Sequence, residues 1–180
     1  MIITDLEVLN TKCEDVLPNE AEELIHLLEK ELDHSAMMGR QGIGLAAIQI
    51  GIPKKIAIVR INKQFSVNLI NCRVEKGYNE FIFKEEGCLS FPNLVKDTKR
   101  YSEVLITNNL LYPHSFIANG VFAVCCQHET DHWNNITILD RAIKAPVITN
   151  AKVRPNDPCI CGKIDPNTGK VRKYKKCCGG

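Results

Sequence analysis

Two histidines and a glutamate form the pattern in this chain with the clearest chemical meaning. His128 and His132 are four residues apart, so on a helix both imidazoles extend from one face and can bind a single metal ion. Glu129 follows the first histidine and can act beside the metal as a proton carrier without binding it. The alternative is that these are ordinary helix positions, because so short a pattern also arises by chance.

A catalytic metal of this kind usually has three protein ligands and one open position. Proteases with the same pattern take the third ligand from a downstream glutamate or histidine, but no glutamate follows Glu129 and no histidine follows His132. Cys125 and Cys126 are more typical of small buried residues, whereas Cys88 stands in a Glu-Gly-Cys turn where glycine permits close approach. The remaining candidates are Cys13, Cys72, His26, His34 and His114.

The spacing of apolar residues predicts a helix that begins near residue 119 and carries both histidines. Its expected inner face bears Val121, Val124, Cys125, His128 and His132. The histidines thus continue an apolar stripe that points into the protein, where a polar group needs a partner.

Other elements are predicted around this helix. Residues 19–38 favour a helix with Asn19 as its N-cap and Gly39 at its end. Residues 42–49 read as a loop of small residues, followed by a turn at 51–53. Strands are predicted at 55–61, 65–70, 79–83, 102–107 and 112–118, with an irregular segment at 85–92.

The composition is that of a globular protein with an unusual tail. Of the 180 residues 44% are hydrophobic and 24% charged, and the net charge is +2. Residues 144–180 hold nine Lys/Arg against two Asp/Glu, whereas residues 1–143 hold 14 against 19. No export signal and no apolar run of about 18 residues is present, so we expect a cytoplasmic protein outside the membrane. The nine cysteines then favour thiols or metal ligands, and four of them lie in the last 22 residues.

Three segments resemble the signature motifs of peptide deformylases. Residues 42–49 (GIGLAAIQ), 86–90 (EGCLS) and 127–132 (QHETDH) are similar to GxGLAAxQ, EGCLS and QHExDH, in the same order. The resemblance covers about residues 5–143. It implies an α+β fold with antiparallel strands around a central metal-binding helix. It also implies an enzyme that removes the formyl group from formylmethionyl nascent peptides and releases formate.

The resemblance implies a role for each residue of the metal site. Cys88, His128 and His132 would be the metal ligands, and Glu129 the general acid and base that takes a proton from the water on the metal. A thiolate ligand tolerates ferrous iron as well as zinc. Ferrous iron is the expected metal, with zinc or nickel as alternatives.

The resemblance also implies residues that contact the substrate. Gln49, through its side-chain amide, and Leu89, through its backbone N–H, would stabilise the oxyanion. The residues near the substrate methionine would be Ile43, Gly44, Val124 and Cys125. Ordinary core packing is the alternative for these four positions.

Arg100 matches a family position that pairs with the aspartate of the third motif, here Asp131, in a structural role beside the ligands. The sequence also departs from the family. Asn135 stands where the family commonly has glycine, and if this position needs a positive φ, asparagine is the next-best residue after glycine. Val95 stands where some deformylases carry an arginine that contacts the peptide.

The tail resembles the SEC-C motif, a small zinc-binding module, at residues 156–162 and 173–179. A tetrahedral structural zinc site would be formed by Cys159, Cys161, Cys177 and Cys178. Fifteen residues separate the two cysteine pairs, more than in the usual motif, and 165–169 read as an inserted turn. The alternative is a disordered basic tail. The expected domains are a catalytic domain at 1–143, a linker at 144–155 and a zinc module at 156–180.

The basic tail suggests contact with an acidic surface, such as the ribosome or an acidic protein, without sequence-specific nucleic acid binding. Two other functions compete with the hydrolase. A catalytically inactive body could serve as a binding protein through its tail, but the complete set of catalytic residues argues against this. An endopeptidase is disfavoured because the downstream ligand is missing.

Overall fold

The structure of the protein is a computed structural model, and it describes residues 1–62, 64–108, 114–143, 155–156, 165–166, 168 and 170–177. The chain divides into two units, Met1–Ile143 and Lys144–Gly180. No helix among the described residues is long and apolar enough to cross a membrane.

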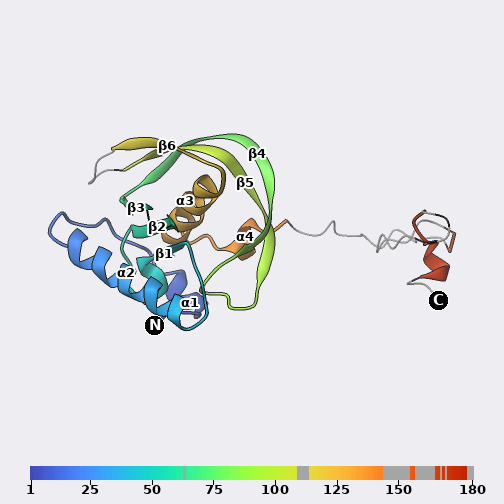
Figure 1. Cartoon of the computed structure of the whole chain (residues 1–180), viewed down its shortest axis with the longest axis horizontal. Helices are drawn as coiled ribbons and strands as arrows, with labels where there is room; N and C mark the ends of the chain where they lie inside the picture. Colours follow the sequence, from blue (N-terminus) through green and yellow to red (C-terminus); the bar gives the residue numbers. More distant parts are fainter. Residues whose placement is uncertain are drawn as a thin grey trace. The chain divides into compact units, whose positions relative to one another are not determined.

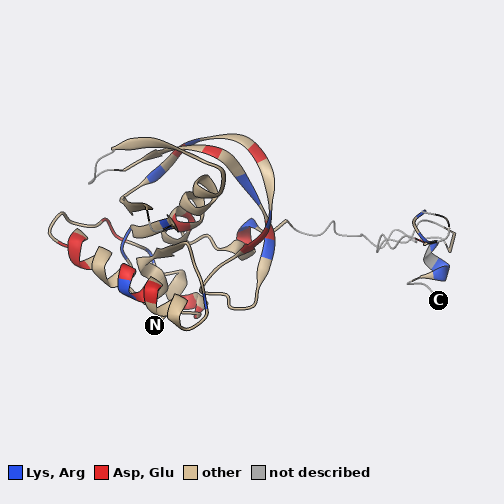
Figure 2. Cartoon of the chain, in the orientation of Figure 1, with Lys and Arg blue, Asp and Glu red and all other residues tan. Residues whose placement is uncertain are grey.

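The first unit combines four α-helices and one 3-10 helix with six strands in its described part (Figure 1). In chain order these are α1 (Leu6–Leu9), α2 (Ala21–Met37), β1 (Gly44–Ala46), the 3-10 helix η1 (Ala47–Ile50), β2 (Ile56–Asn62), β3 (Phe65–Ile70), β4 (Arg73–Gly87), β5 (Val95–Thr107), β6 (Ser115–Asn119), α3 (Gly120–Trp133) and α4 (Ile138–Arg141). Several Asp and Glu residues lie along α2 (Figure 2).

An antiparallel sheet in the order β1-β2-β3 lies between α2 and α3. Alternate residues of a strand face opposite sides of its sheet. Ile56 and Ile58 pack in one core cluster with Leu28 of α2, whereas Ala57 and Val59 pack in the cluster that contains residues of α3. Because both faces are covered, the first half of β2 is a continuous apolar run.

A second antiparallel sheet, in the order β4-β5-β6, arches over α3 (Figure 1). The β4–β5 pairing runs from Arg73 opposite Thr107 to Gly87 opposite Val95, with register shifts at 74–76 and 83–86. The strands predicted at 79–83 and 102–107 were therefore too short. Of the segment 85–92 predicted to be irregular, residues 85–87 belong to β4, but the register shift at 83–86 and the φ of 53° at Glu85 bear out an irregularity there. Most of β4 is exposed, so burial imposes no clear apolar alternation on its sequence.

Helix α3 spans the predicted segment and is almost completely enclosed. Every residue from Ala123 to Trp133 is buried, and the helix contacts strands of both sheets. The prediction that Val121 lies on the buried face was wrong, because this residue of the first turn is 50% exposed. The polar residues 127–132 consequently lie in the protein interior, where each needs a partner.

The boundaries of α2 differ slightly from the prediction. Glu20, not Asn19, is the N-cap, and its side chain instead accepts a hydrogen bond from the Leu17 N–H at 2.8 Å. Gly39 follows the helix with a φ of 79°, and its N–H donates to the Ala36 carbonyl, so the predicted end is confirmed.

Two predictions about short connections had different outcomes. Residues 42–49 are not simply a loop, because 44–46 pair with β2 as β1 and η1 follows directly. Asn135 has a φ of 59°, which confirms that this position needs a residue tolerant of the left-handed conformation.

The described part of the second unit contains a turn and a short helix. The Asp165 N–H donates to the Lys170 carbonyl at 2.8 Å, at the turn predicted for 165–169, and η2 spans Tyr174–Lys176. Cys177 follows this helix. The other three predicted zinc ligands, Cys159, Cys161 and Cys178, lie outside the described residues, as do most of the predicted linker and residues 112–113.

Candidate metal centre

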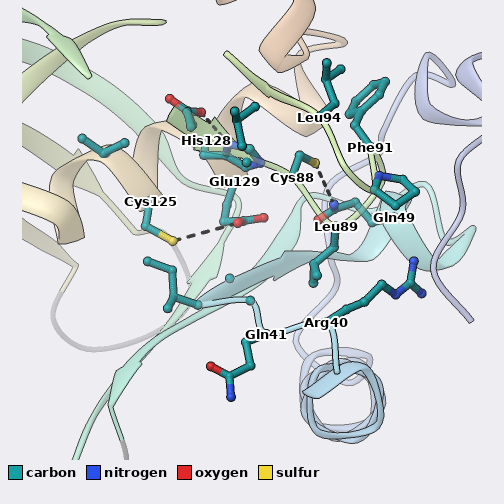
Figure 3. Close-up of a pocket in the computed structure, with 18 of the residues that line it drawn as sticks. Arg40, Gln41, Gln49, Cys88, Leu89, Phe91, Leu94, Cys125, His128 and Glu129 are labelled. Atoms are coloured by element: carbon teal, nitrogen blue, oxygen red, sulfur yellow. Dashed lines mark hydrogen bonds and ion pairs between the residues drawn. The ribbon is translucent and has the colours of Figure 1, made fainter. Parts of the chain in front are cut away.

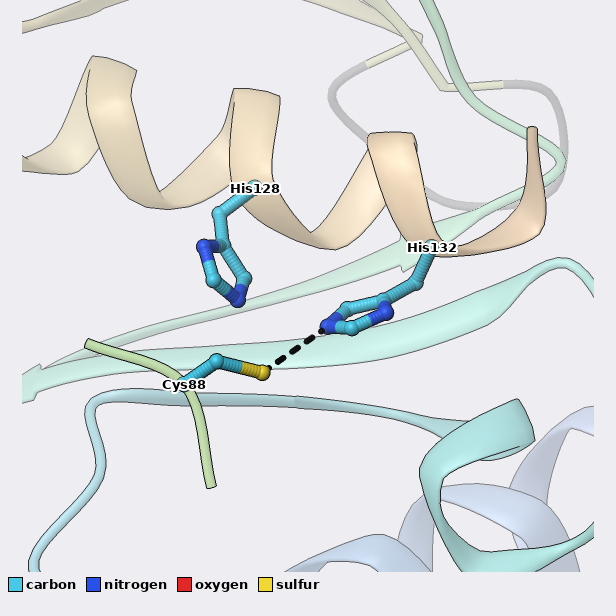
Figure 4. A group of neighbouring side chains, drawn as sticks. All are labelled: Cys88, His128 and His132. Carbon is cyan, nitrogen blue, oxygen red and sulfur yellow. Dashed lines mark hydrogen bonds between the residues drawn. The ribbon is translucent and has the colours of Figure 1, made fainter. Parts of the chain in front are cut away.

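The three predicted metal ligands come together in the first unit (Figure 4). Cys88 directly follows β4, and the two histidines lie one helical turn apart on α3. The ligand atoms of Cys88, His128 and His132 all lie within 4.8 Å of one another, with Cys88 Sγ 3.5 Å from His132 Nε2. Among the described candidates for the third ligand, Cys88 is therefore the one that reaches both histidines.

The chemistry of these donors fits a divalent metal ion. His128 Nδ1 lies 2.6 Å from Glu86 Oε1, so its Nε2 is left for the shared side of the cluster. Burial, followed by the charge on His128, lowers the pKa of His132 well below its usual value and keeps its imidazole neutral. One thiol and two imidazoles within reach of one ion form a three-ligand set with room for a fourth position.

An ion-pair network behind the histidines includes the predicted contact between Arg100 and Asp131. Arg100 Nη1 donates to Asp131 Oδ2 at 2.5 Å, while its Nε and Nη2 donate to Glu86 at 2.8 and 2.6 Å. Arg141 of α4 donates to Asp131 at 2.6 and 2.9 Å. Arg100 thus connects Asp131 with the carboxylate that contacts His128.

Glu86 is the main residue that the sequence analysis missed. Burial alone would raise its pKa, but the hydrogen bonds and charges of His128 and Arg100 outweigh burial and lower the pKa to about 2. The Thr98 hydroxyl donates to the same carboxylate at 2.5 Å. The sequence did point to Glu86, because this residue belongs to the same motif as Cys88. The neighbouring Glu85 is also acidic, however, and its side chain is exposed, so the sequence does not distinguish the two.

Glu129 lies beside the cluster with its carboxylate in a cavity (Figure 3). Its Oε2 has no hydrogen-bond partner among the described residues, and burial raises the pKa of the carboxyl to about 7. A Cβ atom on Gly44 would overlap Glu129 Oε1 and lie 2.8 Å from Cys125 Sγ. The absence of a side chain at Gly44 therefore leaves the room that this carboxylate occupies.

Gln49 is oriented by hydrogen bonds on both ends of its amide. Its Oε1 accepts from the Ala46 N–H at 2.9 Å, and its Nε2 donates to Cys88 Sγ at 3.4 Å and to Ser90 Oγ at 3.1 Å. The amide N–H group thus points toward the cluster. Leu89 follows Cys88 and lines the same cavity.

The cavity in front of the cluster has a volume of about 440 Å³ and a largely apolar lining. All four predicted substrate contacts line it, together with the catalytic candidates: Ile43, Gly44, Gln49, Cys88, Leu89, Val124, Cys125, His128 and Glu129. Val124 and Cys125 are also buried, so these two residues both line the cavity and pack in the protein interior.

Two further polar residues of α3 fix the helix without facing the cavity. Gln127 Nε2 donates to the Tyr101 carbonyl at 2.8 Å, and the Tyr101 N–H donates to Gln127 Oε1 at 2.9 Å. Thr130 donates to the Cys126 carbonyl of its own helix at 2.9 Å. Gln127 therefore attaches α3 to β5, a role that its place in the third motif did not reveal.

Comparisons with known proteins identify the family of this chain. The family model described as polypeptide deformylase matches residues 2–146. A peptide deformylase of Helicobacter acinonychis is 30% identical over 146 residues, 75% of this chain and 80% of that protein. One of Microchaete diplosiphon is 35% identical over 111 residues, 58% of this chain and 59% of that protein, less than two thirds of its length.

The fold gives the same result. The crystal structure of peptide deformylase from Thermotoga maritima matches with a TM-score of 0.69 and 27% identity, over 80% of this chain and 97% of that one. The predicted α+β fold with antiparallel sheets is confirmed. The chain therefore belongs to the peptide deformylase family, metal-dependent hydrolases that remove N-terminal formyl groups from nascent peptides.

Proposed function

We propose that the residues described above carry out deformylation of formylmethionyl nascent peptides in this chain. The observation that supports this best is a single cavity lined by Cys88, His128, Glu129 and Gln49, with the ligand atom of His132 within 4.8 Å of those of Cys88 and His128. The acting groups of a hydrolase are thus within reach of one small substrate.

In this proposal Cys88, His128 and His132 hold the catalytic metal. A divalent metal bound there supplies Lewis acidity, which makes water nucleophilic near neutral pH. We infer ferrous iron, because one thiolate and two imidazoles suit it, with zinc and nickel as alternatives. Metal analysis of protein purified without oxygen distinguishes them.

Glu129 and the two oxyanion donors perform the remaining steps. Glu129 takes a proton from the attacking water as the water oxygen adds to the formyl carbon. Gln49 Nε2–H and the Leu89 N–H donate hydrogen bonds to the formyl oxygen while it carries negative charge. Glu129 then delivers the proton to the methionine nitrogen as the C–N bond breaks, and formate and a free amine result.

The apolar part of the cavity would bind the methionine side chain. Ile43, Gly44, Val124 and Cys125 provide a surface without charge, which suits an unbranched thioether. Behind the ligands, Arg100 and Asp131 would have a positioning role. Through Glu86 they would hold the His128 ring in the orientation that a ligand needs.

The test is formate release from formyl-Met-Ala by the full chain. We expect activity in the native protein and a decrease of about 10²–10⁴-fold in Glu129→Gln, with the bound metal retained. If the native metal-loaded chain releases no formate, the alternative function of a catalytically inactive binding protein is favoured. Cleavage of an internal peptide bond would instead favour an endopeptidase.

For the tail we propose a separate zinc module at 156–180, joined by a linker at 144–155 to the catalytic domain at 1–143. Its zinc ligands would be Cys159, Cys161, Cys177 and Cys178, in a closed tetrahedral site. The full chain should then bind one zinc ion more than the double variant Cys177→Ser, Cys178→Ser. Equal metal contents would rule out the module.

We further propose that the tail directs the enzyme to the ribosome in the cytoplasm, where formylated chains emerge. Nine Lys/Arg against two Asp/Glu in residues 144–180 support electrostatic binding to phosphate-rich surfaces. Co-sedimentation with ribosomes should decrease with salt and disappear on truncation at residue 145. Unchanged co-sedimentation of the truncated chain would refute the proposal.

A further inference from the structure

We infer that Arg40 makes this site prefer peptides with an acidic residue within three positions after the formylmethionine. The inference rests on the proposed deformylase function and specifies its substrate class. It starts from the charge at the entrance of the cavity, where the exposed Arg40 is one of the lining residues (Figure 3).

The backbone of Arg40 is held at both of its polar groups. The Arg40 N–H donates to the Ser35 carbonyl at 2.9 Å, and the Arg40 carbonyl accepts from the Ser35 hydroxyl at 2.8 Å. These bonds, together with Gly39 in the left-handed conformation, terminate α2. The guanidinium therefore extends from a fixed point at the entrance.

Arg40 has no charged partner among the described residues. It is the only lysine or arginine that lines the cavity among the described residues, and none of their ion pairs involves it. The two carboxylates in the lining, Glu86 and Glu129, are buried at 4% and 2% exposure and belong to the metal site. A cation is thus available at the entrance for a substrate group.

The rest of the entrance carries no charge, and its exposed side chains are apolar except for those of Gln41 and Asn93. Ile43, Val95 and Val121 line the cavity with exposures of 41%, 52% and 50%. Val95 cannot supply the charge that an arginine at this position would supply. A peptide that leaves the cavity in an extended conformation advances by about 3.3 Å per residue, so its first few side chains pass this entrance.

The expected effect is modest, because the pair would be solvent-exposed and screened by salt. An exposed ion pair corresponds to about a two- to fivefold difference in kcat/KM between an acidic residue and its neutral isostere. A lysine at the same substrate position should be disfavoured.

The experiment measures formate release from C-terminally amidated peptides, so that no terminal carboxylate contributes. Formyl-Met-Glu-Ala-Ser, formyl-Met-Ala-Glu-Ser and formyl-Met-Ala-Ser-Glu amides are compared with their glutamine counterparts. We expect a Glu/Gln ratio of kcat/KM of about two to five for at least one position at low salt, which falls toward one at high salt.

Variants assign the ratio to one side chain. The ratio should fall to about one in Arg40→Gln and reverse in Arg40→Glu. Arg73→Gln is the matched control, because Arg73 is exposed outside this cavity, and it should keep the native ratio. A ratio of one at all three positions, or a ratio retained in Arg40→Gln, overturns the inference. Failure of the proposed function is distinct, because then no peptide releases formate.

Discussion

Replacing Arg100 with methionine tests whether the buried ion network holds the metal-bearing helix in place. The side chain of Arg100 is 1% exposed and gives three hydrogen bonds, two to Glu86 and one to Asp131. Methionine fills similar space but leaves both carboxylates without this cation. Removing one member of a buried ion pair costs about 3–5 kcal/mol. This is a large part of the 5–15 kcal/mol typical for the unfolding of a domain.

Two matched variants separate burial from charge. Arg141→Met also removes a cation from Asp131, but the Arg141 side chain is 42% exposed, so we expect a loss of about 1 kcal/mol or less. Arg100→Lys retains the charge without the planar arrangement of donors. It should lie between the two methionine variants, because one ammonium cannot reproduce bonds to two carboxylates.

The assay is urea unfolding, at fixed metal concentration and again with a chelator. Fluorescence is the signal, because Trp133 is the single tryptophan of the chain and lies buried at the end of α3. The reasoning is refuted if Arg100→Met and Arg141→Met lower the free energy of unfolding equally. It is also refuted if Arg100→Met lowers it by less than about 1 kcal/mol.

Three other substitutions have defined outcomes. Gly44→Ala should lower kcat by at least about tenfold, because the new methyl group displaces the Glu129 carboxylate, and an unchanged kcat would contradict the overlap. Glu86→Gln should weaken metal binding by about 10–100-fold in a chelator competition, and equal affinity would exclude a role in ligand orientation. Asp140→Asn should cost about 0.5–1 kcal/mol at pH 7, because Asp140 accepts hydrogen bonds from Thr137 N–H and Oγ1–H. These bonds lower the pKa of Asp140 in the folded protein. The native protein should therefore be more stable than Asp140→Asn above the ordinary pKa of aspartate, and this difference in the free energy of unfolding should disappear as the pH falls through the lowered pKa. Unfolding at several pH values measures the difference.

The metal centre could be predicted from the sequence because its signals are local. The spacing of His128 and His132 fixes their common face on any helix, and the missing downstream ligand leaves Cys88 as a strong candidate. Gln49 and Gly44 belong to one short motif. Gly44 begins β1 beside Glu129, and Gln49 lies on η1 and donates to Cys88. In each case the pattern lies within a short stretch of sequence.

The network behind the ligands could not be predicted in the same way. Glu85 and Glu86 look alike in the sequence, but the register shift in β4 places only Glu86, at 4% exposure, against His128. Arg141 reaches Asp131 from α4, ten residues away and on a different element. The β4 strand is mostly exposed, so its length and irregular register leave little periodic signal.

The buried polar residues of α3 explain why one helix carries both the ligands and the rigidity of the site. A shift of α3 by one residue would rotate its side chains by about 100°, which would separate Gln127 from Tyr101 and Asp131 from Arg100. Each of these polar groups would then be buried without a partner, at a cost of about 1–3 kcal/mol per group. An apolar core would tolerate such a shift with a smaller penalty. The hydrogen bonds that satisfy the interior of α3 therefore also select the single register in which His128 and His132 face Cys88.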